Sequence, residues 1–199
     1  MNIKSISVFC GARSGNDRIF EESAYNLGKI LAEQDIRLVY GGGGLGLMGA
    51  VATGALDHGG EVTGIIPEVL VDREMAHTGV QDMRIVKNMS IRKEQLIDEA
   101  DAIVILPGGA GTMEEFFQVF VAGQIGIYQK PIAFVNTAGY YDSLFELFNT
   151  FIQHDFLEER FLELIRKVNR IEDVVEKLEH FTPVKGRTRE DIEKGHSRN

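Results

Sequence analysis

Cysteine and basic residues are scarce in this chain of 199 residues. Cys10 is the single cysteine, which excludes a disulfide within the chain. The 21 lysine and arginine residues are outnumbered by 30 aspartate and glutamate residues, and the net charge of −9 disfavours broad attraction to nucleic acid or to an anionic membrane. No apolar run approaches the roughly 20 residues that a transmembrane helix needs, and no secretory signal pattern opens the chain. We therefore expect a cytoplasmic protein that binds neither nucleic acid nor membrane.

The composition is that of an ordinary globular domain. Apolar residues make up 44% of the chain and charged residues 26%, and the length suits one domain with a substantial core. Residues 1–182 are predicted to form this domain. Residues 183–199 are charged and poor in apolar residues, which predicts a mobile C-terminal tail.

Short apolar segments alternate with segments of helical periodicity along the domain. Strands are expected at 3–9, 36–40, 61–66, 83–86, 102–106 and 131–135. Helices are expected at 18–34, about 50–58, 89–99, 116–127, 140–152, 157–165 and 172–180. This alternation predicts an α/β fold, a single-domain doubly wound (Rossmann-like) parallel sheet flanked by helices.

Three glycine-rich turns follow predicted strands, at 10–15, 41–49 and 107–111. In a parallel sheet the carboxyl ends of the strands meet at one edge, and ligands bind there, at the point where the strand order reverses. Glycines let the backbone approach a ligand closely, and a helix N-terminus attracts an anion. The three turns therefore predict a ligand that carries a phosphate.

The turn at 107–111 leads into the sequence Thr112-Met113-Glu114-Glu115. Thr112 adds a hydroxyl donor, and the two glutamates are expected in the first turn of the next helix. Because adjacent helix residues point roughly 100° apart, at most one of the glutamates should face the ligand loop. Either glutamate alone could be an ordinary first-turn residue.

The turn at 41–49 contains Gly44-Leu45-Gly46-Leu47-Met48-Gly49, which matches the dinucleotide-binding pattern GxGxxG. The acidic residue expected at the end of the next strand is missing, because Ile66 and Pro67 stand there. Glycines also allow close packing of a helix on a sheet. The pattern therefore favours packing over dinucleotide binding.

Arg92 and Lys93 follow Ser90, which is a candidate N-cap for the helix at 89–99. Both side chains could simply be solvated. A basic residue in a first helical turn opposes the helix dipole, so a compensating carboxylate or phosphate partner is plausible. Arg92 suits paired contacts better than Lys93, because its guanidinium is planar and offers several donors.

These motifs together carry a family resemblance. The segments 41–49 and 107–115, with Met89, Arg92 and Lys93 between them, resemble the lonely-guy (LOG) family of cytokinin riboside 5′-monophosphate phosphoribohydrolases, often mislabelled as lysine decarboxylases. The family pattern PGGxGTxxE is matched at every fixed position and ends on Glu115, and the likeness covers about residues 3–180. Further similar segments are Val8–Gly11, Gln124–Gly126, Lys130–Pro131 and Gly139–Tyr141.

The resemblance implies hydrolysis of the N-glycosidic bond of a purine nucleoside 5′-monophosphate, AMP-like or N6-substituted, to free base and ribose 5-phosphate. By position, Arg92 and Glu115 match the catalytic pair, and a carboxylate can stabilise an oxocarbenium-like ribose or activate water. No cofactor and no metal is required. The candidate substrate-binding residues are Glu74, Lys93, Gly43, Gly44, Gly46, Met89, Gly108, Gly109, Ala110, Gly111, Thr112, Met113 and Glu114.

The resemblance also implies a homodimer, with the helices at 89–100 and 111–128 at its interface. Phe116, Phe117, Phe120 and Ile127 are more apolar than one buried helix face needs, which supports this expectation.

The chain departs from the family at four positions that bear on the substrate. Ser90, Val121 and Ala122 stand where the family commonly has histidine, threonine and tryptophan, and Ala12 stands where serine is common. These replacements are expected to affect the base pocket and one hydroxyl contact, not the catalytic pair.

Two other functions stay open. A decarboxylase using pyridoxal phosphate would need a lysine for the Schiff base, and Lys93 is the only lysine near the motifs. A non-catalytic nucleotide or cofactor carrier on the same fold would need only the glycine loops. The presence of both Arg92 and Glu115 favours the hydrolase over the carrier.

Overall fold

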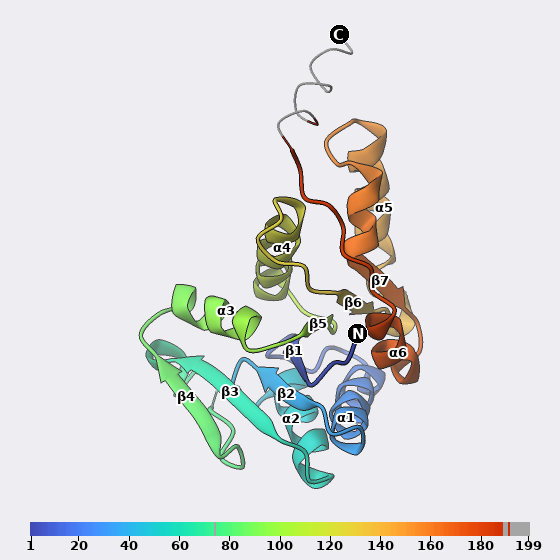
Figure 1. Cartoon of the computed structure of the whole chain (residues 1–199). Helices are drawn as coiled ribbons and strands as arrows, with labels where there is room; N and C mark the ends of the chain where they lie inside the picture. Colours follow the sequence, from blue (N-terminus) through green and yellow to red (C-terminus); the bar gives the residue numbers. More distant parts are fainter. Residues whose placement is uncertain (74, 189–190, 192–199) are drawn as a thin grey trace.

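The computed structural model describes residues 1–73, 75–188 and 191 and contains one sheet of seven strands (Figure 1). The strand order is β4-β3-β2-β1-β5-β6-β7, and all neighbours are parallel. The order therefore reverses between β1 and β5. The strands are β1 Ser5–Phe9, β2 Arg37–Tyr40, β3 Val62–Pro67, β4 Asp82–Val86, β5 Ala102–Ile105, β6 Ile132–Val135 and β7 Ile165–Val168.

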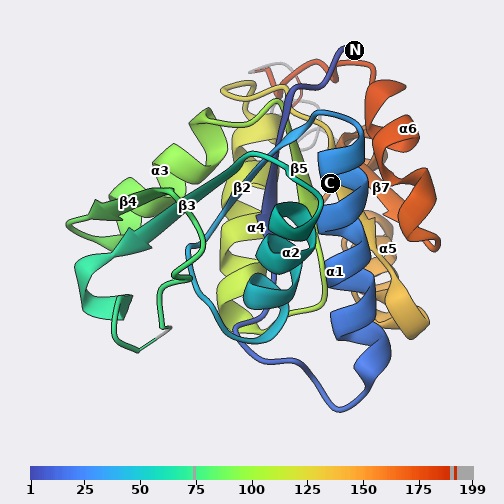
Figure 2. The ribbon, with the colours of Figure 1, turned by 90° about the horizontal axis from the view of Figure 1, so that it is seen from below.

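Helices cover both faces of this sheet, so its central strands are apolar on both sides. In Figure 2, α2 lies in front of the sheet and α4 behind it. The first face packs against α1 Arg18–Glu33, α2 Gly46–Asp57 and α6 Val174–Glu179. The opposite face packs against α3 Met89–Asp98, α4 Ala110–Gln124 and α5 Asp142–Gln153. Short 3-10 helices are η1 Glu68–Leu70, η2 Thr137–Gly139, η3 Glu159–Leu164 and η4 Ile171–Asp173.

The predicted doubly wound parallel sheet is thus confirmed, and most element boundaries agree within a few residues. The largest shift of a helix boundary is that of α4, which begins at Ala110 rather than at Phe116. Its first turn contains small and polar residues with no apolar periodicity, so the pattern of the sequence hides it. Asn88, not Ser90, caps α3: its side chain accepts a hydrogen bond from the Ile91 N–H at 3.0 Å.

The region predicted as a helix at 157–165 is a 3-10 helix followed by the edge strand β7. In this strand Ile165 and Val168 are buried, while Arg166 and Lys167 are more exposed. Four residues with two basic side chains give too short an apolar signal for a strand prediction.

The phenylalanines expected at a subunit interface belong to the core instead. Phe116 and Phe120 are 0% and 2% exposed. The ring of Phe116 lies edge-on to Phe134, with centroids 4.6 Å apart, and also packs against Phe148. Their apolar character is therefore used within the chain, whereas Ile127 is 65% exposed.

The first residues of the predicted tail contact the domain. Val184 is buried, and its N–H donates to the Gln129 side chain at 3.0 Å. The Arg187 N–H donates to the Gln124 carbonyl at 2.7 Å. Most of the predicted tail beyond residue 188 lies outside the described residues. In the part of the chain that the structure describes, no helix is both long and apolar enough to cross a membrane.

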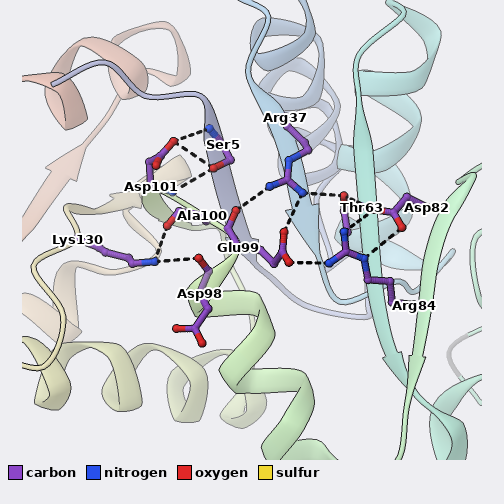
Figure 3. A network of polar contacts seen from close by, with 10 residues as sticks. All are labelled: Ser5, Arg37, Thr63, Asp82, Arg84, Asp98, Glu99, Ala100, Asp101 and Lys130. Atoms are coloured by element: carbon purple, nitrogen blue, oxygen red, sulfur yellow. Dashed lines mark hydrogen bonds and ion pairs between the residues drawn. The ribbon is translucent and has the colours of Figure 1, made fainter.

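Polar side chains join the amino ends of the strands, at the edge opposite the glycine-rich turns (Figure 3). Glu99, at the end of α3, accepts hydrogen bonds from Arg37 of β2 at 3.1 Å and from Arg84 of β4 at 2.7 Å. Arg84 also forms a two-point contact with Asp82. Lys130 donates to the Ile97 carbonyl in the last turn of α3 and to the Ala100 carbonyl just after the helix. These contacts fix the C-terminal end of α3 against the sheet.

Replacing Glu99 by glutamine should lower the free energy of unfolding by about 1 kcal/mol at neutral pH, the upper end for partly exposed ion pairs. The hydrogen bond from Arg84, followed by that from Arg37, lowers the pKa of Glu99 below its ordinary value of 4.5. Stabilisation from a lowered carboxyl pKa is complete above the unfolded-state pKa and is lost as the pH falls through the folded-state pKa. Urea titrations should therefore show the deficit at pH 7 and a smaller one near pH 3.

The matched control is Glu94→Gln, which changes an exposed glutamate on the same helix. It should leave the free energy of unfolding unchanged at both pH values. A deficit for Glu99→Gln that is equal at pH 7 and near pH 3 would mean that the charge of the carboxylate does not stabilise the fold.

Candidate active site

A cavity of about 430 Å³ opens at the carboxyl ends of β1 and β5, where the strand order reverses. The turn after β1, the residue Gly41 after β2 and the turn after β5 all line it. The predicted gathering of glycine-rich turns at this edge is confirmed. This is the position at which open α/β sheets bind their ligands.

The turn after β1 is held between the other two turns. The Gly11 N–H donates to the Pro107 carbonyl at 3.0 Å, and the Leu47 N–H donates to the Gly11 carbonyl at 3.1 Å. Gly46 has a φ of +57°, and a Cβ there would lie 2.4 Å from the carbonyl carbon of Ala12. Gly46 thus serves close packing of two loops, which supports the packing interpretation of the GxGxxG pattern.

The N-terminus of α4 faces open space. Its N-cap is Gly109, with no capping side chain. Among the described residues, the N–H groups of Gly109, Ala110 and Gly111 have no hydrogen-bond acceptor. A Cβ on Gly109 or Gly111 would meet no atom within 4 Å. These free donors and the positive end of the helix dipole suit an anion.

The two adjacent glutamates point in different directions, as expected. Both lie in the second turn of α4 rather than the first, because the helix begins at Ala110. Glu115 lines the cavity. Glu114 forms an ion pair with Lys93 of α3 and does not line the cavity. Of the two carboxylates, Glu115 is therefore the one that faces the cavity.

Arg92 is buried in the cavity wall and is not a solvated first-turn residue. Its side chain is 5% exposed and lines the cavity. Nη2 donates to the Gly41 carbonyl at 2.9 Å, and Nε donates to the Ile65 carbonyl at 3.2 Å. A Cβ on Gly41 would lie 2.1 Å from Nη2, so only glycine fits there. Arg92 thus ties α3 to the ends of β2 and β3 while presenting its guanidinium to the cavity.

The cavity brings together six of the fifteen predicted site residues. Those that line it are Arg92, Glu115, Gly108, Gly109, Gly111 and Thr112. Those that do not are Lys93, Glu114, Met89, Ala110, Met113, Gly43, Gly44 and Gly46. Glu74 lies outside the described residues.

Several of the residues outside the lining have a local structural contact instead. Gly44 lies close to another segment of the chain: its N–H donates to the Met75 carbonyl at 2.8 Å. Gly43 forms a bridge with Ala76. Met89 places its sulfur 3.8 Å from Nη1 of Arg92. The glycines of the second turn thus anchor the connection between β3 and β4.

Other lining residues were not predicted. Arg13 lies in the turn after β1, is exposed, and has no ion-pair partner in the part of the chain described. Two aromatic residues also line the cavity: Phe20, in the first turn of α1, and Tyr140, shortly before α5. The glycine-rich turn at 10–15 was a usable signal for Arg13. No sequence spacing indicates Phe20 or Tyr140, which reach the site only through the fold.

The cavity lacks the lysine that a pyridoxal phosphate decarboxylase needs. No lysine is among the described residues that line it, and Lys93 is paired with Glu114. The residues present therefore do not fit Schiff-base chemistry. The described residues also contain no group of three or more His, Cys, Asp or Glu side chains placed to hold a metal ion.

The fold and the cavity define a doubly wound α/β protein of the Rossmann type. Residues 48–178 match the family model described as "Possible lysine decarboxylase". The chain is 38% identical over 180 residues to LOG3 of Arabidopsis thaliana, a cytokinin riboside 5′-monophosphate phosphoribohydrolase, with 90% of this chain and 84% of LOG3 covered. It is 38% identical to the probable phosphoribohydrolase LOGL1 of Oryza sativa subsp. japonica, with 89% and 79% covered. The chain belongs to the lonely-guy (LOG) family.

Solved structures of the same fold include cofactor carriers. The molybdenum cofactor carrier protein of Chlamydomonas reinhardtii superposes with a TM-score of 0.70 at 18% identity, over 90% of this chain and 98% of that chain. The molybdenum cofactor binding protein of Rippkaea orientalis gives a TM-score of 0.66 at 19% identity, over 90% and 97%. At such identities the likeness is one of fold alone.

Replacing Gly111 by alanine should separate stability from ligand binding. The glycine lies in the first turn of α4, so alanine should leave the free energy of unfolding unchanged or raise it by up to about 1 kcal/mol. Gly111 lines the cavity and a Cβ there meets no atom of the chain within 4 Å, so the added methyl group takes up space that a ligand would use. Crowding of this kind costs roughly 1–3 kcal/mol. We expect the KM for AMP to rise by roughly 10-fold while the melting temperature does not fall. An unchanged KM would place the phosphate away from this helix end.

Proposed function

We propose that this protein hydrolyses the N-glycosidic bond of a purine nucleoside 5′-monophosphate, of AMP or N6-substituted type, to the free base and ribose 5-phosphate. The observation that carries the proposal is that Glu115 and Arg92 line the same cavity as the open N-terminus of α4. The phosphoribohydrolase names of its relatives agree with this chemistry. The presence of both Arg92 and Glu115 in the cavity favours the hydrolase over a carrier that needs only the glycine loops.

The residues of the cavity have separate roles in the proposed reaction. The N–H groups at the start of α4 hold the 5′-phosphate, and this binding energy positions the ribose. As the base leaves, the ribose becomes oxocarbenium-like, and the Glu115 carboxylate stabilises its positive charge or activates the attacking water. Arg92, fixed by the carbonyls of Gly41 and Ile65, orients the negatively charged groups of the site, the Glu115 carboxylate or the 5′-phosphate. Water supplies the hydroxyl of the sugar product, and the base departs with a proton.

Arg13 adds a second guanidinium to the same cavity. Its exposure and its lack of an ion-pair partner among the described residues leave its donors available to a ligand. A planar guanidinium matches the oxygen atoms of a phosphate. Arg13 therefore supplies a local positive charge for binding a doubly charged phosphate, which a chain with a net charge of −9 needs.

Of the four family replacements, Ala12 lies in the lining of the cavity, whereas Ser90, Val121 and Ala122 lie outside it. Val121 is 49% exposed on α4, and Ala122 is 9% exposed. The base preference of the enzyme therefore rests on residues other than Ser90, Val121 and Ala122, or on a second subunit.

A homodimer formed through α3 and α4 is part of the proposal. Val121, Ile125 and Ile127 are between 49% and 65% exposed at the C-terminal end of α4, and Met89 is 37% exposed on α3. Burying these side chains between two copies would remove apolar surface from water. Light scattering should give twice the mass of 22.2 kDa, and a stable monomer at micromolar concentration would contradict the dimer.

Comparing AMP with adenosine, ADP and ATP tests the proposed reaction. Release of free base should be fastest with AMP, because its single phosphate can lie at the N-terminus of α4 while the ribose lies beside Glu115. Adenosine lacks the anchoring group and should react far more slowly. Equal rates with AMP and adenosine would remove the role of the helix N-terminus.

A further inference from the structure

The backbone between β5 and α4 is held by donors from outside the loop. Three successive carbonyls accept hydrogen bonds. That of Leu106 accepts from the Tyr141 hydroxyl at 2.7 Å. That of Pro107 accepts from the Gly11 N–H at 3.0 Å, and that of Gly108 accepts from the Tyr140 hydroxyl at 2.8 Å. Every peptide unit between Leu106 and Gly109 is therefore oriented by another part of the chain.

The Gly108–Gly109 peptide unit is the one that most needs an external contact. Glycine on both sides allows this unit to rotate more freely than any other peptide in the loop. In a planar trans peptide the carbonyl and the following N–H point in opposite directions, and the described chain contains no cis peptide. Holding the Gly108 carbonyl therefore also fixes the direction of the Gly109 N–H, which has no acceptor among the described residues.

Tyr140 and Tyr141 differ in their burial and in the side chains that their rings contact. Tyr141 is 3% exposed, and its ring packs edge-on against Phe134 in the core. Burial raises the pKa of Tyr141, which keeps its hydroxyl a donor. Tyr140 is 47% exposed, lines the cavity and packs edge-on against Phe20, with ring centroids 5.8 Å apart. The Tyr140 hydroxyl therefore reaches the glycine loop from the solvent-accessible side and contributes little to the core.

We propose that Tyr140 is a positioning residue for the phosphate of the substrate. Through the Gly108 carbonyl, its hydroxyl holds the Gly109 N–H in the orientation that a phosphate at the N-terminus of α4 requires. The inference rests on the proposed function for the identity of the ligand. It assigns a share in phosphate affinity to Tyr140, a residue that lies 32 positions along the chain from Gly108.

The test is the variant Tyr140→Phe, which removes one oxygen atom and keeps the ring. Isothermal titration of ribose 5-phosphate and of AMP should give dissociation constants about 3- to 10-fold weaker than for the parent chain, the range of one hydrogen bond. Affinity for adenosine should be unchanged. In turnover of AMP the KM should rise by the same factor while kcat stays within about twofold, as expected for binding lost equally from ground and transition states.

Tyr25→Phe is the matched control. It also removes a tyrosine hydroxyl, one that donates to Asp57 at 2.9 Å on the surface between α1 and α2. It should leave the affinities for both phosphate ligands unchanged. Melting temperatures of both variants should stay close to that of the parent, so a merely structural role for Tyr140 would not produce the expected change in KM.

The outcomes distinguish this inference from the proposed reaction. A Tyr140→Phe chain that binds ribose 5-phosphate as tightly as the parent overturns the positioning role, and so does an equal loss of affinity for adenosine. A parent chain that binds AMP without releasing base overturns the hydrolase, yet the binding comparison still decides the role of Tyr140. A parent chain that binds neither AMP nor ribose 5-phosphate overturns both.

Discussion

Glu115→Gln should turn over AMP at least about 100-fold more slowly than the parent chain, in the range of acid–base and charge-stabilisation effects. Glutamine keeps the shape and the hydrogen-bonding capacity of the side chain but removes the negative charge that opposes an oxocarbenium-like ribose. Glu115 lines the cavity, so the loss should appear in kcat. Initial rates of base release, measured at saturating AMP, provide the comparison.

Glu114→Gln is the matched control on the neighbouring residue. Its side chain is 56% exposed and paired with Lys93 outside the cavity. This variant should lose no more than a few-fold in rate, because an exposed ion pair between α3 and α4 contributes little. If Glu115→Gln hydrolyses AMP at the parent rate while Glu114→Gln does not, the assignment of the two glutamates is reversed. If both keep the parent rate, neither carboxylate takes part.

Arg92→Lys should be impaired in both activity and stability. Lysine keeps the charge but has a single nitrogen, which cannot serve the Gly41 and Ile65 carbonyls together as Nη2 and Nε do. Hydrogen bonds from a charged group contribute about 1.5–3 kcal/mol each, so the free energy of unfolding should fall by roughly 2 kcal/mol. We expect kcat/KM for AMP to fall by about 100-fold, which is the usual effect of removing one positioned hydrogen-bond donor from an active site.

Arg170→Lys controls for the exchange of arginine by lysine. The Arg170 side chain is 72% exposed and lies 3.6 Å from Glu172 on the surface. Neither the rate nor the unfolding free energy should change in this variant. The double variant Arg92→Lys/Glu115→Gln should lose less than the product of the two single losses, because both residues serve one transition state. Strictly multiplicative losses would indicate two independent roles.

Much of the fold could be predicted because local pattern and global structure agree. The apolar runs at β1, β5 and β6 are buried on both sides, as a central parallel strand requires. The failures occur where tertiary contacts decide. β7 is recognisable as a strand only through its pairing with β6. The start of α4 follows from Gly109 and the open space in front of it, not from apolar periodicity.

The candidate site was predicted best where sequence neighbours share one loop. Gly108, Gly109, Gly111 and Glu115 come from a single motif and do line one cavity. The motif could not show that Lys93 and Glu114 would pair with each other outside it.

Residues brought in by the fold were beyond the reach of sequence spacing. Arg92 was identified as a candidate, but its carbonyl partners at the ends of β2 and β3 follow only from the order of strands in the sheet. The same holds for Tyr140, because its contact with Gly108 joins residues that are 32 positions apart in the sequence. Side chains that reach a site from a distant connection leave no periodic pattern to detect.

The most direct measurement is product analysis after incubation of the purified protein with AMP and with an N6-substituted adenosine 5′-monophosphate. The proposed reaction predicts free base and ribose 5-phosphate in equal amounts, without added cofactor, and near-complete loss of both products in Glu115→Gln. Recovery of the intact nucleotide, bound by the parent chain with neither product formed, would contradict it.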